Sequence, residues 1–153
     1  MKQKHWKMLL FGLYCLWMLW LLFGQRFGGG YTVELQLRPF KTLRLFWNAL
    51  FTSQYPGVRS HAFINLLGNV GMFVPLGLFV PWIWQRWRKF WRHLCLMTGI
   101  ILCVELSQLA LCLGTCDVDD LLLNVVGTSL GFVLWKFLEA ILTGTADRQK
   151  KTL

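Results

Sequence analysis

The chain has 153 residues, of which 56% are hydrophobic and only 15% are charged, and its formal net charge is +9. Soluble domains carry about 25% charged residues, so this composition excludes an ordinary soluble domain and indicates a membrane protein. The length favours a single domain over residues 1–153. The Lys and Arg residues lie at the ends of apolar segments, where the positive-inside rule places them. We therefore expect membrane lipids, and not nucleic acid, as partners.

Four apolar segments of membrane length divide the chain. A helix needs about 20 apolar residues to cross the hydrocarbon core of a bilayer, and each segment comes close to that length. The first follows three lysines and lacks the small-residue cleavage site of a signal peptide, which predicts an uncleaved anchor. The sequence thus predicts an all-α membrane protein with four transmembrane helices, at about residues 6–23, 62–84, 94–114 and 121–140.

The second predicted span contains two prolines, Pro75 and Pro81. Each removes a backbone N–H, and its ring clashes with the carbonyl four residues back. We expect a kinked or locally broken helix whose freed carbonyls are satisfied by neighbouring helices.

A shorter helix is predicted between the first two spans. Gly28, Gly29 and Gly30 open the connection as a turn, and the residues before Pro39 avoid the helical region. Apolar residues then recur at helical spacing over residues 40–52, with basic residues between them. This segment is too short to cross a bilayer, which predicts an interfacial or re-entrant amphipathic helix. It either rests on the lipid headgroups or covers a site between the spanning helices.

The distribution of charge predicts the orientation. Ten basic residues lie near the termini and in the loop around residues 85–93, on one side of the predicted membrane. The other side carries five basic residues in a longer loop, together with the acidic turn at residues 117–120. We expect both termini in the cytoplasm, and the amphipathic helix and the acidic turn on the outer face.

Polar side chains inside the predicted spans gather in the outer half of the bilayer. At a rise of 1.5 Å per residue, they lie roughly 6 to 14 Å from the outer ends of their helices. Glu105 is the deepest, and a carboxylate at that depth costs about 2.5–3.5 kcal/mol unless it is paired, protonated or hydrated. It is a candidate acid–base group, or else half of an interhelical polar clasp. The candidates for a ligand-binding cluster are Asn69, Glu105, Gln108, Asp117, Asp120 and Asn124.

The acidic turn before the fourth span has two interpretations. Asp117 or Asp119 can cap the N-terminus of that helix, where a carboxylate suits the helix dipole. Alternatively, Asp117 and Asp120 can hold a divalent cation through oxygen ligands. The spacing matches no calcium loop, so we expect neither a metal nor a cofactor.

Small residues and thiols are candidates for helix packing and for a disulfide. Gly127 and Gly131 form a Gly-x-x-x-Gly seam that allows close helix packing within the bundle or, alternatively, between two copies. The oligomeric state is left open. Cys112 and Cys116 are four residues apart, and the strict geometry of a disulfide favours unpaired thiols.

Four blocks of sequence together resemble the VanZ-like family of small bacterial membrane proteins. They are Pro39-Phe40, then Asn69-x-x-x-Phe73-x-Pro75-x-Gly77, then Glu105-x-x-Gln108, then Asp117-x-Asp119-Asp120-x-x-x-Asn124-x-x-Gly127-x-x-x-Gly131. The resemblance covers about residues 35–135. Gln36 stands where the family usually has Asn, and Thr115-Cys116 lacks the Arg common before the acidic run. Structural roles are expected for Pro39, Phe40, Phe73, Pro75, Gly77, Asp119, Gly127 and Gly131.

The resemblance implies a multi-pass protein of the bacterial cell membrane. The namesake of the family is associated with resistance to teicoplanin, a lipid-tailed glycopeptide that targets cell-wall precursors. We therefore expect a non-enzymatic envelope protein that binds a lipid, a lipid-linked cell-wall precursor or a glycopeptide in an outer-leaflet cavity. Two alternatives remain open: a membrane-embedded enzyme with Glu105 as general acid or base, and a structural or interaction subunit.

Overall fold

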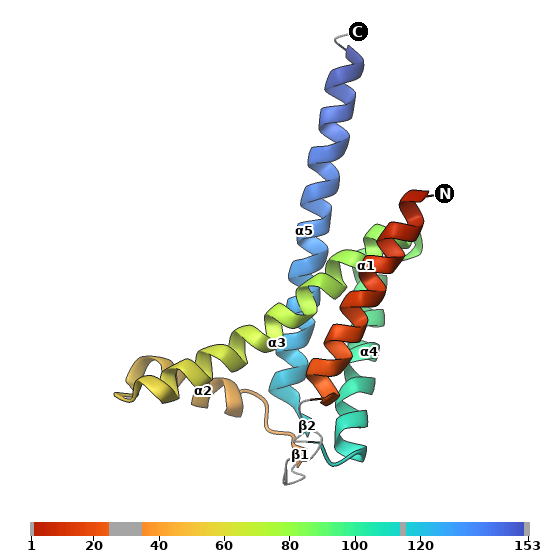
Figure 1. The fold of residues 1–153 in the computed structure, drawn as a ribbon. Coiled ribbons are helices and arrows are strands. Elements are labelled where there is room, and N and C mark those ends of the chain that lie inside the picture. The colour runs from red at the N-terminus through yellow and green to blue at the C-terminus, as the bar shows by residue number, and fades with distance from the viewer. Residues whose placement is uncertain (1, 25–34, 114–115, 152–153) are drawn as a thin grey trace.

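The computed structural model describes residues 2–24, 35–113 and 116–151, and most of them are helical (Figure 1). Four helices are long and apolar enough to cross a membrane: Lys4–Gly24, Pro56–Ile83, Phe90–Ala110 and Val118–Gly144. The predicted all-α membrane fold is confirmed. The elements are α1 (Lys2–Leu19), the π-helical turn η1 (Trp20–Gly24), β1 (Leu35–Gln36), α2 (Lys41–Thr52), α3 (Pro56–Ile83), the 3₁₀ turn η2 (Gln85–Trp87), α4 (Phe90–Ala110), β2 (Cys116–Asp117) and α5 (Val118–Lys151).

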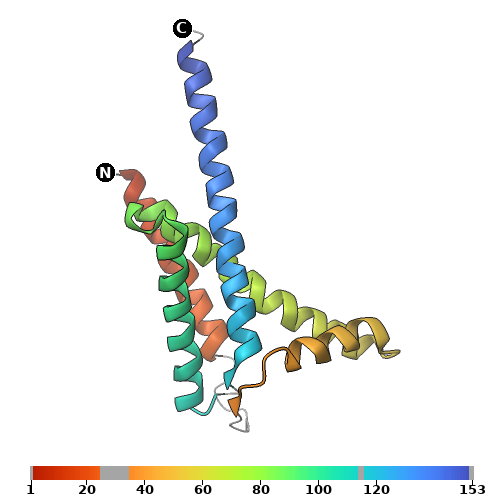
Figure 2. The same cartoon turned by 180° about the vertical axis from the view of Figure 1, so that it is seen from behind.

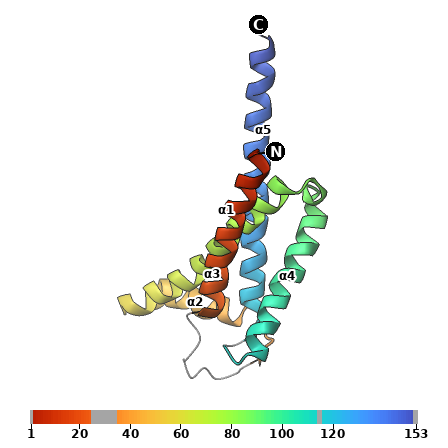
Figure 3. The ribbon, with the colours of Figure 1, turned by 45° about the vertical axis from the view of Figure 1, so that its right-hand side comes forward.

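The crossing of α3 and α5 forms the centre of the bundle. Helix α4 packs on α5, and α1 packs on α3 (Figure 3). Both termini lie at one end of the bundle, and β1 and β2 lie at the opposite end (Figure 1). Helix α2 runs beside the first half of α3, and the two project together from the bundle as an arm (Figure 2).

Three glycines allow the backbones of α3 and α5 to touch. A Cβ atom added at Gly77 would lie 2.0 Å from the carbonyl oxygen of Thr128. One added at Gly127 would lie 2.2 Å from the oxygen of Val70, and one at Gly131 would lie 2.0 Å from that of Val74. The structure therefore places the Gly-x-x-x-Gly seam at a contact within the chain.

The apolar core lies where α1, α3 and α4 meet. Phe73, Met97 and Ile101 are fully buried. The hydroxyl of Tyr14 donates a hydrogen bond of 2.6 Å to the carbonyl oxygen of Met72, which links α1 to α3. Burial of this kind favours association less in lipid than in water, so close packing and such interhelical hydrogen bonds carry more of the stability.

Helix α3 is continuous through both of its internal prolines. The sequence predicted a kinked or locally broken helix, and the described residues of this segment contain no break. Pro56 opens α3 at its first turn, where the missing N–H costs nothing. The helix therefore begins six residues before the predicted start of the second span.

Helix α4 ends at Ala110, four residues before its predicted end. Cys112 takes a left-handed conformation with φ of 55°, and the amide of Leu113 donates a 2.9 Å hydrogen bond to the carbonyl oxygen of Gln108. This geometry is the Schellman motif, which closes a helix end. Cys112 is an exposed free thiol. The side chain of Cys116 and the Gly28–Gly30 turn lie outside the described residues.

Candidate functional site

A short parallel strand pair brings the acidic turn beside the segment that leads into α2. Leu35 of β1 pairs with Cys116 of β2, and Gln36 pairs with Asp117. The residues before Pro39 are extended, as the sequence predicted. Their pairing partner could not be predicted, because the two strands are only two residues long and about 80 residues apart.

Asp119 holds the N-terminus of α2. One of its carboxylate oxygens accepts the amide of Phe40 at 2.6 Å, and the other accepts those of Thr42 and Leu43 at 2.8 and 3.0 Å. The first amides of a helix have no partner within the helix, and a negative charge suits that end of the dipole. Asp119 is fully buried. It therefore caps a helix that starts almost 80 residues earlier in the chain.

Asp117 is the residue that caps α5. Its carboxylate accepts the amide of Asp119 at 2.9 Å, and it also accepts the hydroxyl of Thr42 at 2.5 Å. The sequence assigned the cap of the fourth helix to either Asp117 or Asp119. The structure assigns it to Asp117, because Asp119 already lies in the first turn of α5 and bonds the amides of α2 instead.

The third carboxylate of the turn, Asp120, bonds α3. The side-chain amide of Asn69 donates to Asp120 at 2.5 Å. This contact joins two residues that the sequence had placed in one cluster. The acidic turn thus ties α2, α3 and α5 together through three adjacent side chains.

A second group of polar residues lies deeper, between α4 and α5. The side-chain amide of Asn124 lies 3.5 Å from Glu105, and the amide of Gln108 donates to the carbonyl oxygen of Leu22 at 2.9 Å. Glu105, Gln108 and Asn124 are only 4%, 3% and 3% exposed. Within the described residues, the buried oxygen of Asn124 has no hydrogen-bond partner. The six candidate residues thus gather at one end of the bundle, but the deeper three are enclosed by helices.

One open feature at this end is a surface pocket along α2, here called the α2 pocket. It has a volume of about 720 Å³, and its lining includes Arg38, Phe40, Lys41, Arg44 and Trp47. All five residues are exposed. Lys41, Arg44 and Trp47 are spaced by three and share one face of the helix.

The α2 pocket was missed by the sequence reasoning, which concentrated on the polar residues inside the spans. The sequence did contain a signal for this pocket: Lys41, Arg44 and Trp47 follow one another every three residues, which places them on one face of the predicted interfacial helix. Basic and aromatic residues on such a helix are the composition that contacts lipid headgroups.

The described residues contain no group of three His, Cys, Asp or Glu side chains arranged to hold a metal ion. In the acidic turn, the oxygens of Asp117 and Asp119 accept hydrogen bonds from N–H and O–H groups. The arrangement is suited to fixing the backbone of α2.

Four membrane-length helices, with polar residues enclosed between them, define a multi-pass helical membrane protein. The sequence model of the family described as VanZ/LLP1 matches residues 8–139, which is most of the chain. The chain therefore belongs to the VanZ-like family. No curated protein and no solved structure matches the chain. The family match extends beyond residues 35–135 on both sides, and thus includes most of α1.

Proposed function

We propose that the protein binds a lipid or lipid-linked molecule with an anionic headgroup at the end of the bundle opposite its termini. The positive-inside rule assigns that end to the outer leaflet of the bacterial cell membrane. The protein thereby influences sensitivity to glycopeptides of the teicoplanin type. The observation that carries this proposal is the α2 pocket, which combines basic and aromatic side chains on a helix of interfacial length.

The chemistry of the α2 pocket suits a phosphate or diphosphate ester. The guanidinium groups of Arg38 and Arg44 and the ammonium group of Lys41 offer charge-assisted hydrogen bonds to phosphate oxygens. Trp47 lies with its ring centre 4.5 Å from that of Phe51, and both are exposed. Tryptophan and phenylalanine rings of this kind sit at headgroup depth or just below it. A headgroup at the basic residues would therefore leave its lipid tail beside the aromatic ones.

Asp119 and Asp120 fix the helices that carry the α2 pocket. Asp119 fixes the first turn of α2, from which Lys41 and Arg44 project. Asn69 and Asp120 fix α3 against α5 at the same end. In this proposal the ligand touches the basic residues, while Asp119 and the Asn69–Asp120 pair hold them in place.

The effect on glycopeptides follows from the nature of the ligand. The resemblance that led to the family implies a link to teicoplanin, which targets cell-wall precursors. A precursor joined to its lipid through a phosphate or diphosphate would carry the anionic chemistry that the α2 pocket suits. Binding of the precursor by this protein would change the amount that the antibiotic can reach.

We expect Lys41→Gln combined with Arg44→Gln to weaken binding of a polyprenyl diphosphate by about 25-fold. Each basic residue near an anionic lipid surface contributes about 1 kcal/mol, which is a factor of about five. The measurement is the dissociation constant of the purified full chain in detergent, obtained by counting bound lipid with native mass spectrometry. The same variant should lose any effect of the wild-type protein on teicoplanin sensitivity at equal expression.

The matched control is Arg92→Gln combined with Arg86→Gln, which removes the same charge at the other end of the bundle. Equal loss of binding in the two double variants would mean that total charge, and not the α2 pocket, attracts the lipid. Unchanged binding in the Lys41 and Arg44 variant would reject the proposal outright.

A structural or interaction role is the second candidate, and the enclosure of Glu105 favours it. A substrate could reach a carboxylate that is 4% exposed only if the helices separated. Acid–base catalysis by Glu105, the enzyme alternative, therefore requires an opening motion of the bundle. A polar clasp between Glu105 and Asn124 requires no such motion.

We expect Glu105→Gln to keep most of the stability of the bundle and Glu105→Leu to reduce it by about 1–3 kcal/mol. Glutamine retains an oxygen that accepts the amide of Asn124, whereas leucine leaves that buried amide unsatisfied. Unfolding of the two variants in detergent mixed with dodecyl sulfate measures the difference. If Glu105→Gln abolishes function while its abundance and stability match wild type, the clasp does not explain the role of Glu105.

A further inference from the structure

The end of the bundle that carries the termini holds a second pocket, formed around Trp82 and Trp135 by residues of α1, α3 and α5 and by Arg88 of the loop between η2 and α4. We propose that this pocket binds the phosphate of an anionic phospholipid from the leaflet at that end. Its volume is about 430 Å³, and its lining includes Lys7, Trp82, Arg88, Trp135 and Glu139. This site lies at the opposite end from the α2 pocket and does not depend on it.

Two cations are held over two indole rings at the pocket. The ammonium group of Lys7 lies 4.4 Å from the centre of the Trp82 ring, and the guanidinium carbon of Arg88 lies 5.4 Å from that of Trp135. Cation–π contacts of this length fix the position of a charge without neutralising it. Paired Trp and basic residues are also typical of the headgroup depth of a membrane.

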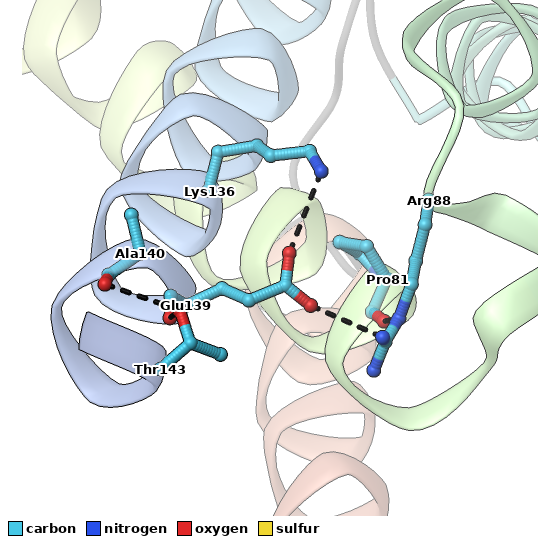
Figure 4. A network of polar contacts seen from close by, with 6 residues as sticks. All are labelled: Pro81, Arg88, Lys136, Glu139, Ala140 and Thr143. Carbon is cyan, nitrogen blue, oxygen red and sulfur yellow. Dashed lines mark hydrogen bonds and ion pairs between the residues drawn. The ribbon is translucent and has the colours of Figure 1, made fainter. Parts of the chain in front are cut away.

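A carboxylate orients the arginine and is shared with a lysine. Glu139 accepts Arg88 at 3.0 Å and Lys136 at 3.4 Å, and Nε of Arg88 donates to the carbonyl oxygen of Pro81 at 3.2 Å (Figure 4). These contacts use Nε and one terminal nitrogen of the guanidinium. Among the described residues the other terminal nitrogen makes no ion pair, and it can bind a phosphate oxygen, which suits a planar guanidinium. Lys136 offsets the charge of Glu139, so the surroundings of the pocket stay positive.

The remaining lining is mostly apolar and suits acyl chains. Leu78 of α3 and Leu138, Ile141 and Leu142 of α5 supply apolar side chains, and Thr143 completes the lining. A phosphate at the cations would therefore place the glycerol and first methylenes against leucine and isoleucine. Basic pockets between transmembrane helices bind anionic headgroups in this manner. Free inorganic phosphate would leave the apolar part of the pocket unused, which commits the proposal to a phospholipid.

The experiment is photo-crosslinking of the purified full chain in nanodiscs that contain a phosphatidylglycerol with a diazirine in its acyl chain. Peptide mass spectrometry then locates the label. We expect labelling of the α5 segment at residues 135–143, and about fivefold less in Lys7→Gln, the factor for one basic residue near an anionic surface. Lys7 is the first choice because it makes no ion pair among the described residues, so its removal spares the fold. Lys7→Arg should restore the labelling.

Arg92→Gln is the matched control, since Arg92 belongs to the same end but lines a different pocket. Equal loss of label in Arg92→Gln and Lys7→Gln would overturn the site in favour of general surface charge. Equal labelling by a phosphatidylcholine probe would show that the pocket does not select an anionic lipid. Loss of the label in millimolar inorganic phosphate would show that the pocket binds the free ion instead.

Discussion

Replacement of Gly131 by alanine is expected to destabilise the bundle by ~3 kcal/mol, the upper part of the usual cost of overpacking. The added Cβ atom would lie 2.0 Å from the backbone oxygen of Val74 and 2.9 Å from the backbone nitrogen of Leu78. Both are backbone atoms of α3, so no side-chain rotation can relieve the clash. Helices α3 and α5 must separate, and the contacts along their crossing weaken together.

Gly71→Ala provides the matched control within α3 itself. A Cβ atom at Gly71 meets nothing within 4 Å, and alanine favours a helix by up to about 1 kcal/mol. The free energy of unfolding of both variants is measured by circular dichroism in detergent titrated with dodecyl sulfate. We expect Gly71→Ala to equal or exceed wild type. If Gly131→Ala is equally stable, the close crossing of α3 and α5 is wrong.

The same experiment separates the two roles that the sequence allowed for the Gly-x-x-x-Gly seam. A seam between two copies would make the loss of stability depend on protein concentration. The contacts of Gly127 and Gly131 with Val70 and Val74 lie within one chain. We therefore expect the loss in Gly131→Ala to be independent of concentration.

The spans and the amphipathic helix could be predicted because their signals are local. A run of apolar residues sets the length of a membrane helix, and helical spacing over residues 40–52 identified α2. The predicted ends of these helices were less accurate. The predicted third span ran to residue 114, because its apolar pattern contains no signal for the left-handed conformation of Cys112 that ends α4. Helix α5 continues to Lys151, well past its apolar segment.

The sequence could predict how deep each polar residue lies in the membrane, because depth follows from its position along a helix. It could not predict which polar side chains contact one another. Counting residues placed Asn69, Glu105, Gln108 and Asn124 in the same half of the bilayer but did not single out pairs. In the structure Asn124 lies 3.5 Å from Glu105, and Asn69 donates to Asp120. Counting could not show that the deeper pair is enclosed, because enclosure depends on how helices lean against one another. The rule for helix caps considers only neighbours in sequence, so it offered Asp117 or Asp119 as the cap of the fourth span and could not show that Asp119 bonds α2. The strand pairing that carries α2 to Asp119 has no local signal.

We expect Asp119→Ala to release α2 from the bundle while the spanning helices stay folded. The change removes the acceptor of three backbone amides, at Phe40, Thr42 and Leu43. Hydrogen bonds to a charged group contribute about 1.5–3 kcal/mol each, and some of the freed amides can turn to water. The free energy of local opening of α2 should therefore fall by about 2–3 kcal/mol. Hydrogen–deuterium exchange of residues 40–52 measures this opening directly.

Asp120→Asn is the control, because it alters the neighbouring carboxylate and leaves the cap of α2 in place. Its exchange in α2 should match wild type, as should the exchange of α4 in both variants. Faster exchange throughout the chain of Asp119→Ala would mean that Asp119 supports the whole bundle. Unchanged exchange in α2 would mean that the three amide contacts do not hold it.

Asp119→Ala also tests how the α2 pocket works, because it removes a negative charge and touches none of the basic residues. On charge alone, the variant should bind an anionic lipid more tightly. If the pocket instead requires a fixed first turn of α2, binding of a polyprenyl diphosphate should weaken, because Lys41 and Arg44 then lose their relative position. We expect weaker binding, and Asp119→Asn, which keeps one acceptor oxygen, should lie between Asp119→Ala and wild type. Tighter binding would show that the basic residues act without the support of the buried turn.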